Sequence, residues 1–157
     1  MNRRFDAFER IARIAGVLGN IPEEARISSH PFDERNIHSD ISAVSINLFD
    51  DGHYSQATFE AFKLIDLKVK RISKMNDSGY KLMMAAFAET NPKIKLTTLS
   101  TQSELDEQMG YKFIFAGAMV AIRNPRGHEI NIDQIGRCLD HLSLASVLLR
   151  RLEDTVP

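Results

Sequence analysis

Apolar residues recur every three to four positions along most of this chain, which is the spacing of one face of an α-helix. The clearest stretch is residues 54–75, whose apolar positions share one broad face at 100° per residue. They are Ala57, Ala61, Phe62, Leu64, Ile65, Val69, Ile72 and Met75. No long stretch alternates apolar and polar residues, as a half-buried strand does. The pattern therefore predicts an all-α fold.

The same spacing predicts five further helices, each bounded by residues that form turns or helix ends. They cover residues 3–18, 37–49, 80–88, 103–123 and 131–154. Ser103 and Asp106 have the spacing of a capping box at the start of the fifth helix of the chain. Residues 21–36 are predicted to be irregular, and residues 91–101 form an irregular connector or a short strand around residues 94–99.

These elements predict one domain over residues 1–157, a helical bundle with short connections. Residues 37–153 form the bundle, and the N-terminal helix and irregular segment of residues 1–36 pack on it. The chain is long enough to hold a core without disulfides or metal ions. Its 43% apolar and 26% charged residues exclude a disordered tail, a fibrous repeat and a disulfide scaffold.

The net charge of the chain excludes one class of function. The chain has 20 Lys and Arg against 21 Asp and Glu, a net charge of −1. A strongly basic nucleic-acid-binding protein is therefore excluded, whereas a local basic site is not. The single cysteine, Cys138, fits a reducing cytoplasm and the apolar face of the last helix. The longest nearly apolar run, residues 111–122, is shorter than the roughly 20 residues that cross a bilayer. We expect a cytoplasmic protein with no membrane segment.

The segment with candidate chemistry is RNPRGH, residues 123–128. The run before it, YKFIFAGAMVAI, is apolar around the whole helix, which predicts a buried, central helix. Its small residues would let another helix approach closely. They are Ala116, Gly117, Ala118 and Ala121.

The spacing of Arg123 and His128 limits how they can act together. On a continuous helix they would lie about 140° apart, too far to share a site. Pro125 removes a backbone donor, Asn124 is pushed out of the helical region because it precedes proline, and Gly127 relaxes the backbone. We therefore expect a break that turns His128 back towards Arg123, or towards a second copy of the motif.

These residue types suit the cleavage of RNA. An arginine holds phosphate oxygens in a bidentate fork, and a histidine can take or give a proton near neutral pH. The 2′-hydroxyl of RNA is an internal nucleophile, so no metal ion or other cofactor is required, and DNA is spared. One histidine per chain is short of an acid and a base, which a twofold homodimer would supply. The alternative is that Arg123 and His128 only cap the carbonyls at a helix end.

The hexapeptide RNPRGH resembles the R-x4-6-H motif of the HEPN superfamily, in which a polar residue such as Asn124 follows the arginine. More widely the sequence resembles the Ymh family of bacterial and phage proteins, which is linked to abortive infection. Three stretches carry this likeness besides the C-terminal LDHLSLASVLLRRLE of residues 139–153. They are LFDDGHYSQATFEAFK, GYKLMMAAF and SELDEQMGYKFIFAGAMVAIRNPRGHE.

The resemblance implies a helical bundle, a homodimer, and a metal-independent endoribonuclease of phage defence or of a toxin–antitoxin system. Arg123 and His128 would be the catalytic pair, and Asn124 an assisting polar group. One alternative is a non-catalytic HEPN module that binds nucleic acid, a nucleotide or a partner protein, such as an antitoxin or a component of a defence complex. A second is a structural dimerisation subunit of such a complex.

Two further cations are candidate RNA contacts. Arg126 lies inside the motif, and Lys112 interrupts the apolar run, where it reaches a dimer groove or covers apolar surface with its stem. The histidines and aspartates near residues 30–53 lack the spacing of a zinc site, so we assign them to turns and caps. They are His30, Asp33, His38, Asp40 and His53. His141 is expected to be exposed on the last helix.

Overall fold

The computed structural model describes residues 29–129 and 132–155. The chain divides into two compact units, residues Met1–His30 and Pro31–Pro157. The elements below belong to the second unit. The helix predicted over residues 3–18 and the irregular segment up to residue 28 lie outside the described residues. The last helix begins at Ile135 with Gln134 as its N-cap, and residues 132–134 are not helical, so its predicted start at residue 131 is wrong.

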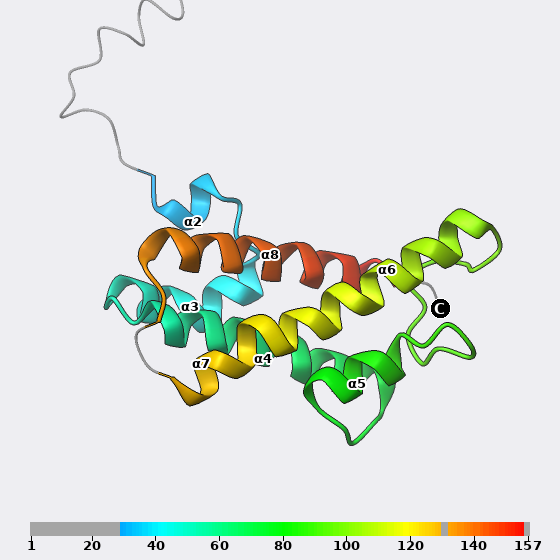
Figure 1. Ribbon diagram of the computed structural model, residues 1–157. Helices are drawn as coiled ribbons and strands as arrows, with labels where there is room; N and C mark the ends of the chain where they lie inside the picture. Colours follow the sequence, from blue (N-terminus) through cyan, green and yellow to red (C-terminus); the bar gives the residue numbers. More distant parts are fainter. Residues whose placement is uncertain (1–28, 130–131, 156–157) are drawn as a thin grey trace, which may run out of the picture. The chain divides into compact units, whose positions relative to one another are not determined.

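The described residues of the second unit are mainly helical, which confirms the all-α prediction (Figure 1). None of their helices combines the length and apolar composition needed to cross a bilayer. The elements are α2 (Pro31–Glu34), α3 (Ser39–Asp50), α4 (Tyr54–Ser73), α5 (Gly79–Ala86), α6 (Gln102–Ala118), the π-helical turn η2 (Met119–Arg123), α7 (Asn124–His128) and α8 (Ile135–Glu153).

Helix α4 is at the centre of the bundle, because it packs against α3, α5, α7, α8 and η2. Its predicted apolar face supplies Ala61, Phe62, Ile65 and Val69 to the core, and all four are fully buried. The helix ends at Ser73, and its C-cap Lys74 adopts the left-handed conformation with φ 56°. The central position that the sequence assigned to the helix before the motif therefore belongs to α4.

Helices α6, η2 and α7 follow one another along one continuous helical path (Figure 1). The N-cap of this path is Thr101, two residues before the predicted cap Ser103. Thr101 accepts a bond from the backbone N–H of Glu104, and the Glu104 carboxylate accepts one from the N–H of Thr101. The box at Ser103 and Asp106 is therefore wrong. The Ser100 hydroxyl and backbone N–H also bind Glu104, and these bonds lower its pKa to about 2.

The connector before α6 buries Ile94 and Leu96 but forms no strand among the described residues. A buried glutamine takes the place of a pairing strand. Gln108 of α6 accepts from the backbone N–H of Leu96 at 2.9 Å and donates to the carbonyl of Ile94 at 3.0 Å. Of the two alternatives predicted for this connector, the described residues show the irregular one and not a strand, and the bonds of Gln108 satisfy part of its backbone.

Candidate functional site

The motif segment is helical from Arg123 to His128, so the predicted break is wrong. Asn124 has φ −63° and ψ −45° although it precedes Pro125. The turn before it explains this result. Residues 119–123 form a π-helical turn, in which the N–H of Asn124 donates to the carbonyl of Met119, five residues earlier. The wider turn shifts the carbonyls that would otherwise meet the proline ring.

Arg123 is held by an aromatic ring instead of a carboxylate. Its guanidinium carbon lies 5.1 Å from the centroid of Phe59 on α4, and one terminal nitrogen donates to Asn124 Oδ1 at 3.2 Å. Its Nε is buried without a hydrogen-bond partner. Among the described residues Arg123 makes no ion pair, so its positive charge is not neutralised by a neighbouring carboxylate.

Gly127 lets Phe59 lie against the motif helix. A Cβ atom at position 127 would be 3.1 Å from Cε2 of the Phe59 ring, tighter than ordinary van der Waals contact. The absence of a side chain here therefore brings α4 and α7 together. Because the same ring supports Arg123, Gly127 contributes indirectly to where that guanidinium lies.

His128 is exposed at the end of α7, and among the described residues it makes no hydrogen bond to Arg123. With the chain helical between them, the two side chains leave the helix about 140° apart. One copy of the chain therefore does not bring the predicted catalytic pair together on one face. Of the two arrangements expected from the sequence, only the one that uses a second copy is compatible with this geometry.

Arg126 has a different environment from Arg123, three residues earlier. Its Nε and one terminal nitrogen donate to the two carboxylate oxygens of Asp133, and the other terminal nitrogen donates to the carbonyl of Ile122 at 2.7 Å. The exposed fraction is 4% for the Arg126 side chain and 0% for that of Asp133. Because its donors are occupied, we leave Arg126 out of the proposed RNA contacts.

This buried ion pair joins three helices. The backbone N–H of Asp133 donates to the Ser55 hydroxyl on α4, and Nδ1 of His141 on α8 lies 3.2 Å from the Arg126 guanidinium. We call Ser55, Arg126, Asp133 and His141 the motif-side network. It fixes α7 against α4 and α8, because a bidentate Arg–carboxylate pair defines both distance and orientation.

The motif-side network shifts the pKa of two members. Burial raises the pKa of Asp133, but the bonds and charge of Arg126 outweigh burial, and the pKa lies below its usual value. Burial and the adjacent Arg126 lower the pKa of His141. The side chain of His141 is 19% exposed, so its predicted exposure is wrong.

Cys138 lies next to this network, fully buried on α8. The Thr58 hydroxyl donates to its sulfur at 3.5 Å. Burial raises the pKa of the thiol to about 11, so the sulfur stays protonated and is a poor nucleophile at neutral pH. The prediction of a small core residue is confirmed.

Lys112 is buried on α6, and its ammonium group is paired with Glu89. Its Nζ also lies 4.4 Å from the centroid of Phe113. The RNA contact predicted for Lys112 stays a prediction, and the pairing with Glu89 reduces the charge that it could offer to a phosphate.

The path from α6 to η2 exposes apolar side chains, although the sequence predicted burial around the whole helix. Phe113, Ile114 and Val120 are 54%, 45% and 50% exposed. Gly117, between Ile114 and Val120, and Ala121, directly after Val120, are also exposed. The prediction of burial around the whole helix is therefore wrong, because only part of this apolar helix finds partners within the described residues of one chain.

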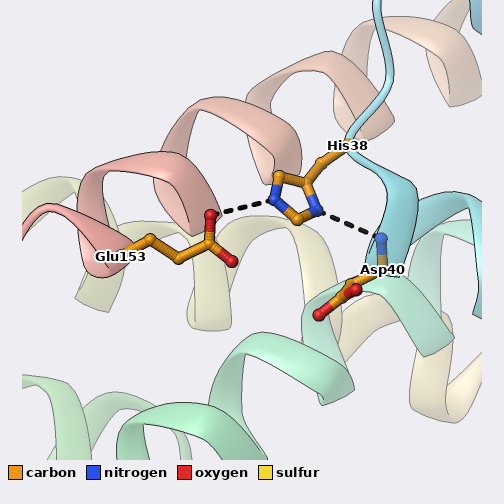
Figure 2. A group of neighbouring side chains, drawn as sticks. All are labelled: His38, Asp40 and Glu153. Carbon is orange, nitrogen blue, oxygen red and sulfur yellow. Dashed lines mark hydrogen bonds and ion pairs between the residues drawn. The ribbon is translucent and has the colours of Figure 1, made fainter.

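A second polar cluster lies at the start of α3 and the end of α8 (Figure 2). Nδ1 of His38 accepts from the backbone N–H of Asp40, and Nε2 lies 3.0 Å from the Glu153 carboxylate. Lys68 of α4 pairs with Asp40 at 2.5 Å and lies 3.9 Å from Glu153. We call His38, Asp40, Lys68 and Glu153 the cap-side cluster. The cap role predicted for His38 is confirmed.

The ligand atoms of His38, Asp40 and Glu153 lie within 4.8 Å of one another, as those of a metal site would. Two contacts oppose that interpretation. A metal on Nε2 would require the proton on Nδ1, where the backbone N–H of Asp40 needs an acceptor. The ammonium group of Lys68 already pairs with Asp40 and lies near Glu153, so a cation occupies the space beside these carboxylates. Capping and ion pairing account for the cluster.

A cavity of about 460 Å³ lies between the first turns of α4 and the end of α7. Phe59 lines it, as does Gly127 of the motif. Neither Arg123 nor His128 is among its lining residues, which are His53, Ser55, Gln56, Phe59, Glu60, Arg126, Gly127 and Glu129. His53 occupies the N-cap position of α4 but makes no side-chain bond to the helix.

A family model described as "Protein of unknown function (Hypoth_ymh)" matches residues 35–152. The chain belongs to the Hypoth_ymh family. No curated protein and no solved structure matches it. The part of the chain that matches the Hypoth_ymh model includes all of α7 and the motif-side network, whereas Glu153 of the cap-side cluster lies one residue beyond it.

Proposed function

We propose that this Hypoth_ymh protein is a metal-independent endoribonuclease of HEPN type that acts in phage defence, by abortive infection or as a toxin. The observation that carries the proposal is the environment of Arg123. This guanidinium is held on Phe59 without a carboxylate partner among the described residues, and the exposed His128 lies at the end of α7, the short helix that follows Arg123. A cation that no neighbouring carboxylate neutralises is suited to an anionic ligand.

In the proposed reaction one imidazole removes the proton of the 2′-hydroxyl, and the 2′-oxygen attacks the adjacent phosphorus. The bond to the 5′-oxygen breaks, and a second, protonated imidazole gives that oxygen its proton. The products are a 2′,3′-cyclic phosphate and a 5′-hydroxyl. Arg123 stabilises the negative charge that develops on the phosphate oxygens, and Asn124 holds the guanidinium through its Oδ1 atom.

Two copies of the chain supply the two imidazoles in this proposal. The steps between Phe113, Gly117, Val120, Asn124 and His128 are three or four residues, so these positions follow one side of the helical path. The exposed apolar side chains on that path are suited to a self-complementary interface around a twofold axis. Such an interface would place His128 of each copy near the motif of the other.

The test is cleavage of RNA by the purified protein in the presence of EDTA, with analysis of the product ends. We expect 2′,3′-cyclic phosphate ends, which Arg123→Ala and His128→Ala abolish while the circular dichroism spectrum stays that of the wild type. Arg71→Ala, at an exposed position of α4, is the matched control and should cut normally. Normal cutting by both motif variants would contradict the assignment of the site.

The interface is tested separately with Phe113→Glu, which places a charge on the exposed apolar face. We expect a monomer in sedimentation velocity experiments and loss of cleavage, with the helical fold retained. Asp106→Asn, at an exposed position earlier on the same helix, should leave the sedimentation coefficient unchanged. A monomeric wild-type protein that still cleaves RNA would contradict the two-copy site.

A non-catalytic module is the second candidate function. It is favoured by the pairing of Arg126 and Lys112 with carboxylates, because Arg123 is then the one motif cation without such a partner among the described residues. RNA that binds through Arg123 but is never cut would support this second function and contradict the first.

A further inference from the structure

The cavity beside the motif has a size and a lining suited to a small flat ligand. Its volume of about 460 Å³ lies within the range of small-molecule sites. Phe59 supplies an aromatic wall, and Gln56, which is exposed on α4, supplies an amide with both donors and an acceptor. Unpaired bases of RNA are recognised in this way, by contact with aromatic rings and hydrogen bonds to their edges.

The charges around the cavity argue against a phosphate as its occupant. Glu60 and Glu129 line it, and a carboxylate repels an anion. Lys63 holds the Glu60 carboxylate at 3.1 Å, whereas Glu129 makes no ion pair among the described residues. Arg126 also lines the cavity, but its charge is neutralised by Asp133. The available charged group is therefore an acceptor, the carboxylate of Glu129.

A carboxylate can only accept hydrogen bonds, so it selects a base edge that donates. Guanine is the base with two adjacent donors on its Watson–Crick edge, the N1–H and the N2 amino group, which match the two oxygens of one carboxylate. Phe59 also connects the cavity to the motif, because its ring lines the cavity and lies 5.1 Å from the Arg123 guanidinium carbon. A base and a neighbouring phosphate of one RNA strand can therefore be bound together.

We propose that this cavity binds an unpaired guanine of the RNA substrate, with the base against Phe59 and its donor edge on Glu129. The inference rests on the proposed function, since it takes RNA as the substrate. It adds a base preference and the residue that determines it.

The experiment measures the affinity of the full chain for eight-nucleotide 2′-O-methyl RNAs by fluorescence anisotropy. The 2′-O-methyl group blocks attack by the 2′-oxygen, so the affinity is measured without cleavage of the RNA. The oligonucleotides are all uridine except at one position, which carries guanine, adenine, cytosine or an abasic site. We expect the guanine oligonucleotide to bind about tenfold more tightly than the abasic one.

Glu129→Gln replaces one acceptor oxygen by a donor with little change of shape. We expect it to remove the guanine preference, and Gln56→Ala to weaken guanine binding by a smaller factor. Asp154→Asn is the matched control, because Asp154 is exposed at the end of α8 and does not line the cavity. Equal affinity for all four oligonucleotides, or a guanine preference that survives Glu129→Gln, would overturn the inference.

The two proposals fail in different ways. A guanine preference removed by Glu129→Gln, together with no cleavage of unmodified RNA, supports the cavity assignment and overturns the ribonuclease. Cleavage that requires Arg123 and His128, together with no preference among the oligonucleotides, supports the ribonuclease and overturns the cavity assignment.

Discussion

The motif-side network and the cap-side cluster are built from the same residue types but differ in burial. Each contains a histidine, a cation and a carboxylate from separate segments of the chain. Arg126 and Asp133 are almost completely buried, whereas the carboxylates of Asp40 and Glu153 are about half exposed. Water competes for the second pair of carboxylates and not for the first. We therefore expect the buried motif-side network, and not the half-exposed cap-side cluster, to hold its helix in one orientation.

The largest difference between the two groups is expected when a carboxylate is removed. Asp133→Ala leaves the Arg126 guanidinium buried without its partner, and we expect the free energy of unfolding to fall by about 3–5 kcal/mol. Urea denaturation followed by circular dichroism measures it. The double variant Arg126→Met with Asp133→Leu removes both charges and should be closer to the wild type than Asp133→Ala. A loss below about 1 kcal/mol for Asp133→Ala would remove the distinction between the groups.

The cap of α3 is the next largest contribution. His38→Ala removes the acceptor for the backbone N–H of Asp40, and we expect a loss of about 1 kcal/mol. His38→Asn keeps an acceptor at the N-cap position and should retain most of that stability in the same urea titration. Equal losses in the two variants would show that the bond to Glu153, and not the cap, is the important contact of His38.

The ion pair of the cap-side cluster is expected to contribute less. Asp40→Asn removes the charge that faces Lys68, and we expect a change of at most about 1 kcal/mol because Asp40 is half exposed. The change should shrink further in 1 M NaCl. A loss comparable to that of Asp133→Ala, unaffected by salt, would contradict the comparison.

The smallest expected effect is a pH dependence that belongs to the motif-side network. Burial and Arg126 lower the pKa of His141 in the folded protein, so the unfolded chain binds a proton first as the pH falls. Stability should therefore decrease as the pH falls below about 6.5, the ordinary pKa of histidine. His141→Gln should show a shallower decrease between pH 7.5 and 5.5 in urea titrations. An unchanged slope would place the titrating group elsewhere.

Several fold elements could be predicted because their information is local. The apolar face of α4 and the turn after α3 depend on neighbouring residues, and the structure confirms both, except that Ile72 of the predicted face is 41% exposed. The predicted position of the capping box was wrong by two residues, although Thr101 and Glu104 have the consensus spacing and acid of a capping box, whereas Ser103 is followed by the weaker Asp106. The choice between an irregular connector and a strand around residues 94–99 stayed open, because a strand needs a partner that the local sequence does not reveal.

The candidate site was less predictable. Proline at position 125 predicts a break by local rules, and the π-helical turn that accommodates it depends on packing against α4. Phe59, Asp133 and His141 gave no recognisable signal, because their roles depend on contacts between helices. The spacing of Gly127 within the motif was visible in the sequence, but its reason, the close approach of Phe59, was not.

The sequence alone determined the helical class of this protein, the position of most helices and the residue types available at RNPRGH, since periodicity and composition are properties of the chain. Only the packing of the folded chain determined which partner each of the two motif arginines contacts. Arg126 meets a buried carboxylate and becomes a structural contact, while Arg123 meets an aromatic ring. Burial and partner, which are set by packing between distant segments, determine whether an identical side chain supports the fold or remains available to a ligand.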